Sequence, residues 1–263
     1  MRLRVLWVSG WGFSAEGFRP AADCLRVRGE RRAADVDHRF FDWTAGRTPE
    51  ALLRALKTAL VAVRQEAGEK ADPKRRGRVA VVAWSLGALA VLSLGPALLN
   101  GIDALVIVGG TPRFLRAPDW PHGWDERALE RFRRRFVRRP METFGRFLRD
   151  VFGETPESIE RIALPVADPS VQASAMAGLM LLERLDAREG LGDLRLPLYI
   201  LHGAEDAIVP LSAASALRER LPQGSLTVWE TAGHAPHLER PADFCAWLGT
   251  SLREVMDGGE PRP

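Results

Sequence analysis

Apolar residues in this chain gather in short continuous runs, separated by longer segments with helical spacing. Such runs predict strands over residues 4–9, 78–84, 104–110, 196–203 and 225–230, and the more mixed segment 36–43 is interpreted as a further strand. Between the runs, apolar positions three and four residues apart predict helices over residues 18–27, 49–67, 86–94, 210–221 and 241–256. The strand runs lack a period of two. The pattern therefore predicts an α/β fold, with a mostly parallel central sheet and helices on both faces.

The alternation of strands and helices is interrupted once. Residues 111–124 contain Pro112, Pro118 and Pro121 and predict a loop, and residues 125–190 predict helices throughout, without a convincing strand. We therefore expect an α/β core formed by residues 1–110 and 191–257, a helical lid formed by residues 111–190, and a frayed tail at residues 258–263.

Composition narrows the class of protein. Hydrophobic residues make up 46% of the 263 residues, which suits a large core and argues against global disorder. No apolar run approaches the length of a membrane span, and the N-terminus begins directly with a strand-like run, so we expect a cytoplasmic protein with no membrane partner. We also expect a monomer. Cys24 and Cys245 lie in amphipathic helical segments, and we expect both to be reduced packing residues.

Charge is distributed unevenly along the chain. The formal net charge is +3, and the excess is carried almost wholly by arginine. From Arg113 to Arg149 there are 11 arginines against 5 acidic residues. The local surplus of 6 positive charges in the predicted lid therefore exceeds the net charge of the whole chain.

Ser85 lies where a predicted strand meets a predicted helix. The sequence Ala83-Trp84-Ser85-Leu86-Gly87 approximates the nucleophile elbow G-x-S-x-G, in which a sharp strand-to-helix turn presents a serine. Small residues at Gly87 and Ala88 allow strand and helix to approach closely, and Ala83 replaces the first glycine of the motif. The alternative is that Ser85 is an ordinary helix N-cap.

A serine nucleophile needs a base, and the base needs an orienting acid. Asp206 and His234 each follow a predicted strand, in the order serine, acid, histidine. Because the C-terminal ends of parallel strands lie at one edge of a sheet, we expect Ser85, Asp206 and His234 to converge there. Taken singly, Asp206 is a candidate turn residue and His234 a candidate loop histidine, and Glu205 is a competing acid.

The other histidines lack the context of His234. His237 follows it by three residues and is expected to pack on the next turn, and no role is assigned to His38, His122 and His202. No cluster has metal-ligand spacing and no glycine-rich phosphate loop is present, so we expect neither a metal nor a cofactor.

Two backbone N–H groups are candidates for an oxyanion hole. One belongs to Leu86, directly after the serine, and the other to Trp11 in the Gly10-Trp11-Gly12 loop after the first strand. Flanking glycines let the backbone of Trp11 approach a reacting centre. The alternative is a glycine-rich turn with a packing tryptophan.

These motifs together resemble the α/β-hydrolase superfamily. Within it, the chain is most similar to the pimeloyl-[acyl-carrier protein] methyl ester esterases of biotin synthesis. The resemblance rests on Gly10-Trp11-Gly12, Trp84-Ser85-Leu86-Gly87, Thr111-Pro112-x-Phe114, Trp120-Pro121, Arg146-Phe147-Leu148, Gly203-x-x-Asp206-x-x-Val209-Pro210 and Gly233-His234-x-Pro236-x-x-Glu239-x-Pro241. The chain departs from the family at Ser9, at Ala83, and in a shortened loop at Asp42-Trp43-Thr44.

The resemblance implies an α/β-hydrolase fold with a lid and a Ser85–His234–Asp206 triad acting through an acyl-enzyme. It also implies a substrate, the methyl ester of pimeloyl-[acyl-carrier protein]. Two alternatives stay open. One is a carboxylesterase of broad specificity for short acyl esters, and the other is a non-catalytic module of the same fold that binds a carrier protein or ligand.

The lid has two chemically different faces. Leu129, Phe132 and Phe136 form an apolar stripe at helical spacing. We expect substrate contacts from lid and core residues together, namely Trp11, Trp84, Met141, Phe144 and Phe147. On another face, an arginine series is a candidate docking surface for an acidic acyl-carrier protein, namely Arg127, Arg131, Arg134 and Arg138. The alternative is a solvated helix face, and nucleic acid is disfavoured because no binding motif is present.

Overall fold

The computed structural model describes residues 2–27, 36–68, 76–153, 157–253 and 255. The predicted tail at residues 258–263 lies outside them. The described residues form one six-stranded sheet in the order β2-β1-β3-β4-β5-β6, with every neighbouring pair parallel. The strands are β1 (Leu3–Val8), β2 (Val36–Phe41), β3 (Arg78–Trp84), β4 (Ala104–Val108), β5 (Leu198–Gly203) and β6 (Gly224–Trp229). The predicted α/β fold with a parallel sheet is confirmed.

Burial explains why the strand runs lack alternation. All residues of β4 and all but the first residue of β3 are buried, because helices cover both faces at the centre of the sheet. The edge strands β2 and β6 contain residues that are only partly buried or exposed. The hydrophobic core therefore lies on both sides of the central strands.

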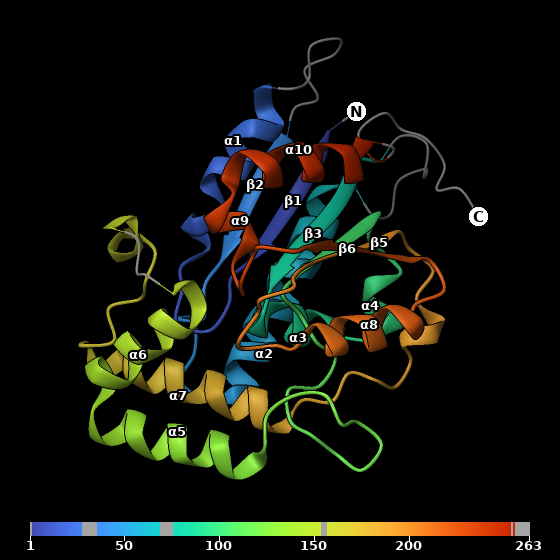
Figure 1. Cartoon of the computed structure of the whole chain (residues 1–263). Helices are drawn as coiled ribbons and strands as arrows, with labels where there is room; N and C mark the ends of the chain where they lie inside the picture. Colours follow the sequence, from blue (N-terminus) through green and yellow to red (C-terminus); the bar gives the residue numbers. More distant parts are fainter. Residues whose placement is uncertain (1, 28–35, 69–75, 154–156, 254, 256–263) are drawn as a thin grey trace.

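Two layers of helices enclose the sheet (Figure 1). α1 (Arg19–Val27) and α10 (Pro241–Ser251) lie side by side on one face, preceded in the chain by the short helices η1 (Ala15–Phe18) and α9 (Pro236–Glu239). The other face is covered by α2 (Pro49–Glu66), α3 (Leu86–Leu92) and α8 (Leu211–Glu219). α3 ends early because Pro96 opens a separate short helix, α4 (Pro96–Leu99). None of the described helices is long and apolar enough to cross a bilayer.

The segment between β4 and β5 contributes three longer helices beyond one end of the sheet (Figure 1). They are α5 (Glu126–Arg138), α6 (Pro140–Phe152) and α7 (Pro169–Arg184), accompanied by the short helices η2 (Glu157–Arg161) and η3 (Leu191–Asp193). Continuous helix over residues 125–190 was a wrong prediction, since residues 162–168 and 185–190 are not helical. α6 ends at Gly153, whose φ is 69°, and Pro165 lies in the stretch before α7.

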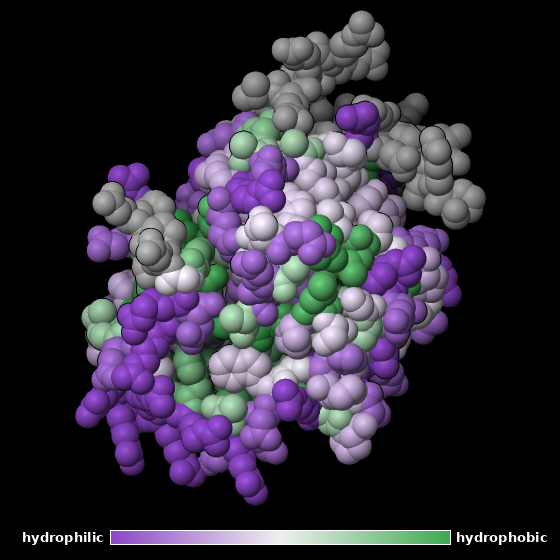
Figure 2. All heavy atoms as spheres, viewed as in Figure 1, coloured by the Kyte–Doolittle hydropathy of each residue, from purple (hydrophilic) through white to green (hydrophobic). Residues whose placement is uncertain are grey.

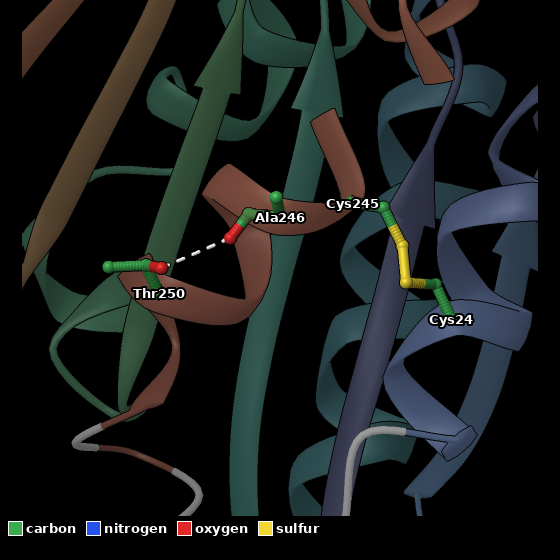
Figure 3. The surroundings of a disulfide bond; sticks show 4 residues. All are labelled: Cys24, Cys245, Ala246 and Thr250. Atoms are coloured by element: carbon green, nitrogen blue, oxygen red, sulfur yellow. Dashed lines mark hydrogen bonds between the residues drawn. A yellow bond between two sulfur atoms is a disulfide. The ribbon is translucent and has the colours of Figure 1, made fainter. Parts of the chain in front are cut away.

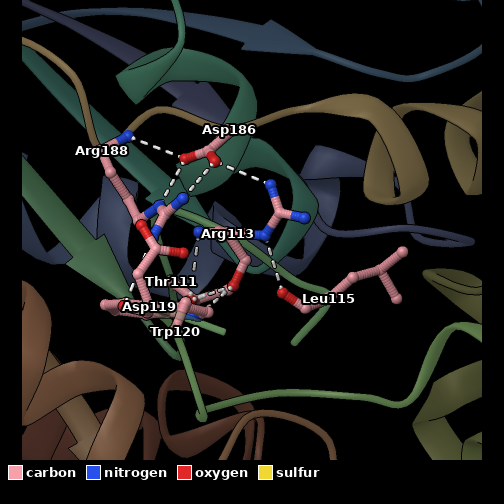
Figure 4. Close-up of polar contacts among 7 residues, drawn as sticks. All are labelled: Thr111, Arg113, Leu115, Asp119, Trp120, Asp186 and Arg188. Carbon is pink, nitrogen blue, oxygen red and sulfur yellow. Dashed lines mark hydrogen bonds and ion pairs between the residues drawn. The ribbon is translucent and has the colours of Figure 1, made fainter. Parts of the chain in front are cut away.

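A network of charged groups joins the two ends of this helical segment (Figure 4). Arg188 forms ion pairs with Asp119 at 2.8 Å and with Asp186 at 2.7 Å, and Arg113 pairs with Asp186 at 2.7 Å. The Arg188 guanidinium, with help from Arg113 and despite partial burial, lowers the pKa of Asp186 to about 2. The network therefore stays charged over the physiological pH range and ties residues after β4 to residues after α7.

The two cysteines form a disulfide between α1 and α10 (Figure 3). Their Cα atoms lie 6.2 Å apart, although 221 residues separate them in the sequence. The expectation of two reduced packing residues was therefore wrong. Distance along the chain gave no sign of the pairing, because it arises from the packing of the first and last long helices of the core.

Candidate active site

Ser85 occupies a sharp turn between β3 and α3. Its φ of 54° and ψ of −118° make it the one non-glycine residue with positive φ among the described residues. Strain of this kind persists where the surrounding structure holds it, and here the Ser85 N–H donates to the Val108 carbonyl at 3.0 Å. A Cβ at position 87 would lie 2.6 Å from the Ser9 carbonyl oxygen, so the turn requires Gly87. The backbone therefore presents the Ser85 side chain at the C-terminal edge of the sheet.

His234 and Asp206 reach Ser85 from two later loops. The Ser85 hydroxyl lies 2.8 Å from His234 Nε2, and His234 Nδ1 lies 2.8 Å from Asp206 Oδ2. Asp206 follows β5 and His234 follows β6, so parallel strands place both loops at the edge where β3 ends. The structure thus brings together the three residues that the sequence selected. Glu205, the competing acid, is exposed.

The Asp206 carboxylate is buried and held on both oxygens. Oδ1 accepts hydrogen bonds from the N–H groups of Ile208 and Val209, each at 2.8 Å. Burial by itself would raise the pKa of Asp206, but His234, His202 and the Val209 amide outweigh it and lower the pKa below its usual range. Asp206 is therefore an ionised acceptor for the Nδ1–H of His234, which leaves Nε2 free to accept a proton from Ser85.

The two candidate oxyanion donors flank Ser85. Leu86 is the first residue of α3, so its N–H belongs to the helix turn that has no intrahelical acceptor. The loop after β1 passes close by, since a Cβ built on Gly10 would lie 3.3 Å from Ser85 Cβ. Both backbone segments are thus near the serine, one on the nucleophile turn and one on the Trp11 loop.

Trp11 also links the core to the helices above it. Its indole Nε1 donates to the Ala175 carbonyl in α7 at 2.7 Å. Four phenylalanines of α5 and α6 meet its ring edge-on, with centroid distances between 4.9 and 5.8 Å, namely Phe132, Phe136, Phe144 and Phe147. These aromatic contacts fix α5 and α6 over the serine.

A narrow cavity of about 20 Å³ opens beside Ser85. Apart from Ser85, its lining is apolar: Trp11, Phe114, Trp124, Leu129, Phe132, Phe147, Leu179, Leu182 and Ile208. Of the residues expected to contact substrate, Trp11 and Phe147 line this cavity. Trp84 and Phe144 are buried outside the lining, and Met141 is 59% exposed on the surface of α6.

Several lining residues escaped the sequence-based selection. Phe114 and Trp124 lie in the proline-containing loop, and Leu179 and Leu182 lie on α7. The available signal was the group of aromatic residues in this loop, Phe114, Trp120 and Trp124, but which of them face the serine depends on how the loop folds back. Trp124 Nε1 donates to the Ile208 carbonyl at 2.8 Å, which fastens this loop to the segment that carries Asp206.

The departures from the family pattern lie in a packed region beside the site. The Ser9 hydroxyl donates to the Phe41 carbonyl at 3.3 Å, and Trp43 Nε1 donates to the Ser9 carbonyl at 2.7 Å. Ala83 is fully buried within β3. The shortened loop is therefore closed by Trp43, which packs against the strand that leads into the Trp11 loop.

Arginines cover the outer surface of α5. Arg127, Arg131, Arg134 and Arg138 are all exposed, and hydrophilic residues gather over this helix in Figure 2. A surface groove runs between α5 and α6 and is lined by Arg131, Arg134, Arg135, Arg138, Arg139, Arg146 and one acid, Glu142. Arg135, Arg139 and Arg146 extend the surface beyond the predicted series. Within the described residues no group of three His, Cys, Asp or Glu side chains is placed to hold a metal.

His237 lies behind the site and takes no part in the Ser85–His234–Asp206 chain. Its ring packs on Phe18 and Trp84, with centroid distances of 4.6 and 4.7 Å. Neither ring nitrogen has a hydrogen-bond partner among the described residues. Burial, with a smaller contribution from His234, lowers the pKa of His237 to about 3.

Acidification is expected to destabilise the fold through His237. The unfolded chain binds a proton at this residue near pH 6.5, but the folded chain does so only near pH 3, so stability is lost as the pH falls between these values. The loss from this group is about 2 kcal/mol at pH 5. Urea unfolding at pH 7 and pH 5 should show a smaller loss for His237→Leu than for the wild type. Equal losses would contradict this origin.

Comparison with known proteins agrees with this geometry. A model described as the Alpha/beta hydrolase family matches residues 5–247. A pimeloyl-[acyl-carrier protein] methyl ester esterase from Aromatoleum aromaticum is 35% identical over 188 residues, which cover 68% of this chain and 74% of that protein. A protein of the same name from Nitrosomonas europaea is 32% identical over 173 residues, covering 64% of this chain and 69% of that protein.

A solved structure shares the fold. An esterase from Exiguobacterium antarcticum superposes with a TM-score of 0.77 at 17% identity, covering 96% of this chain and 92% of that one. The chain therefore belongs to the alpha/beta hydrolase family, within which it is a carboxylic ester hydrolase.

Proposed function

We propose that this chain is a serine esterase that hydrolyses the methyl ester of pimeloyl-[acyl-carrier protein] in biotin synthesis. The observation that carries the serine chemistry is the hydrogen-bonded chain from Ser85 through His234 to Asp206, with both links at 2.8 Å. The substrate is inferred from relatives of that name at 35% and 32% identity.

The reaction begins with attack on the ester carbonyl. His234 Nε2 takes the proton of Ser85 as the serine oxygen bonds to the carbonyl carbon. Asp206 keeps the imidazole in the tautomer with a proton on Nδ1 and stabilises the imidazolium that forms. The Leu86 and Trp11 N–H groups receive the negative charge that develops on the carbonyl oxygen.

Two further steps release the products. The tetrahedral intermediate expels the methoxy group, which takes the proton from His234 and leaves as methanol. Water then loses a proton to His234 and attacks the acyl-enzyme, and the proton returns to the Ser85 oxygen as the free carboxylic acid departs. In this proposal the serine attacks the distal methyl ester, so the thioester to the carrier remains intact.

The apolar cavity favours a neutral ester over the acid that is formed. Among the described residues that line it, the only polar side-chain groups are the Ser85 hydroxyl and the indole N–H groups of Trp11 and Trp124. Both indole groups already donate to backbone carbonyls, so neither is available to bind a carboxylate. Burial of an unpaired carboxylate is unfavourable, so the charged product is expected to leave.

The arginine surface of α5 supports a carrier-linked substrate. An acidic carrier protein would be attracted to this surface, which lies on the same helix as the cavity residues Leu129 and Phe132. Docking there would bring a tethered acyl chain close to the cavity beside Ser85. If the arginines only form a solvated helix face, no preference for a carrier-linked ester is expected.

A broad carboxylesterase for short acyl esters is the second candidate, and the narrowness of the cavity favours it. The two functions differ in their preferred substrate. A methyl ester esterase of biotin synthesis should restore growth without biotin to a strain that lacks its own enzyme, and the Ser85→Ala variant should not. Turnover of short esters without rescue would favour the second candidate, and no ester turnover at all would favour a non-catalytic binding module.

A further inference from the structure

His202 is a buried histidine that lies beside Asp206 but outside the proposed proton path. It is the penultimate residue of β5, and its side chain is fully buried, like that of Asp206. Its Nε2 lies 2.8 Å from the Val209 carbonyl oxygen and 3.3 Å from Asp206 Oδ2. The sequence assigned it no role, because nothing in its spacing relates it to the serine.

The neighbours of His202 determine which nitrogen carries the proton. The Val209 carbonyl and the ionised Asp206 carboxylate are both acceptors, so Nε2 must be the protonated nitrogen and donates to Val209. Nδ1 is buried and has no hydrogen-bond partner among the described residues. A second proton there would leave an unsatisfied donor in the core. Burial accordingly lowers the pKa of His202, although the Asp206 charge opposes this effect.

His202 and Asp206 hold the same residue from opposite sides. Val209 accepts from His202 through its carbonyl and donates to Asp206 Oδ1 through its N–H. Val209 therefore connects His202 to Asp206, and these two hydrogen bonds fix the rotation of the Asp206 carboxylate. In addition, the His202 N–H dipole faces Oδ2, the oxygen that accepts from His234.

We infer that His202 is a positioning residue for the Ser85 site, acting through Asp206 as a neutral imidazole with its proton on Nε2. This inference rests on the proposed serine esterase function. His202 holds the orienting acid in place and offsets part of its charge, which sets how strongly Asp206 favours the imidazolium of His234. Asp206 and His234 are the titratable groups whose charges act on His202.

Substitution of His202 tests whether this residue positions Asp206 or only fills space in the core. Leucine removes the N–H, so the Val209 carbonyl loses its partner and Asp206 becomes less well compensated. We expect kcat for a p-nitrophenyl ester to fall about tenfold with KM nearly unchanged, because the acid is displaced. The apparent pKa in the kcat/KM profile should rise by about half a unit, because a less compensated carboxylate favours the His234 imidazolium.

Two further variants serve as controls. Glutamine carries an N–H at a similar reach, so His202→Gln should restore most of kcat and the wild-type pH profile. His237→Leu removes a second buried imidazole close to the site that lies outside the hydrogen-bonded chain, and it should leave the pH profile unchanged. A packing role would instead give the same profile for both His202 variants as for the wild type, and that result would overturn the inference.

Nitrogen NMR tests the inference without any substitution. The ¹⁵N shifts of the folded wild-type protein should show His202 neutral at pH 7 with its proton on Nε2, and a proton on Nδ1 or a charged ring would overturn the assignment. Failure of the proposed function is recognised separately. In that case wild-type protein lacks ester turnover, or Ser85→Ala retains it, whatever the His202 variants do.

Discussion

Replacing Ser85 by alanine is expected to abolish ester hydrolysis while the protein stays folded. The substitution removes the oxygen that attacks the ester and leaves His234 bound to Asp206 at 2.8 Å. A nucleophile of this kind accounts for a fall in kcat of about 10⁴-fold or more. Turnover of p-nitrophenyl butyrate by the purified variant measures the loss, and circular dichroism checks the fold.

A second serine in the same region provides the matched control. Ser93 follows α3, and its hydroxyl donates to the Ala90 carbonyl at 2.7 Å, away from the cavity lining. Ser93→Ala should keep wild-type turnover. If Ser85→Ala hydrolyses the ester at the rate of Ser93→Ala, the nucleophile assignment is wrong.

Reversing three lid arginines to glutamate is expected to impair hydrolysis of a carrier-linked ester and to spare a small one. Arg131, Arg134 and Arg138 are exposed on α5 and line the groove beside α6. The triple change replaces attraction to an acidic carrier with repulsion. We expect kcat/KM for the carrier-linked methyl ester to fall about 100-fold at low salt, and the difference to shrink at high salt.

The control for this variant carries the same change in charge at another place. Arg54, Lys57 and Arg253 are exposed outside the lid, and their reversal to glutamate should leave carrier-linked turnover close to that of the wild type. Equal losses in the two triple variants would show that net charge alone matters. Equal losses on carrier-linked and small esters would show that the lid variant damages the site itself.

Much of the fold was readable from the chain because the central strands are continuous apolar runs. β3 and β4 are buried on both faces, so their sequences contain no polar alternation to confuse with a surface strand. The lid was less predictable. Its helices end where Gly153 and the ion-paired segment around Asp186 and Arg188 interrupt them, and ion pairs between distant residues leave no periodic signal.

Some site residues were likewise predictable from the sequence, and others were not. Ser85, Asp206 and His234 each follow a strand, so parallel topology alone brings their loops to one edge. The side chains of Met141 and Phe147 share the apolar side of α6 in the sequence, yet Met141 is exposed and Phe147 is buried against Trp11. His202 and the Cys24–Cys245 pair depend wholly on tertiary packing, which spacing along the chain does not encode.

The most direct measurement is mass spectrometry of a methyl-pimeloyl carrier protein after incubation with the purified enzyme. The account predicts loss of the methyl group as methanol, with the pimeloyl thioester still attached to the carrier, and no reaction with Ser85→Ala. An unchanged carrier-linked ester in the presence of an enzyme that turns over short esters would contradict the proposed substrate. Release of the acyl chain from the carrier would contradict the proposed site of cleavage.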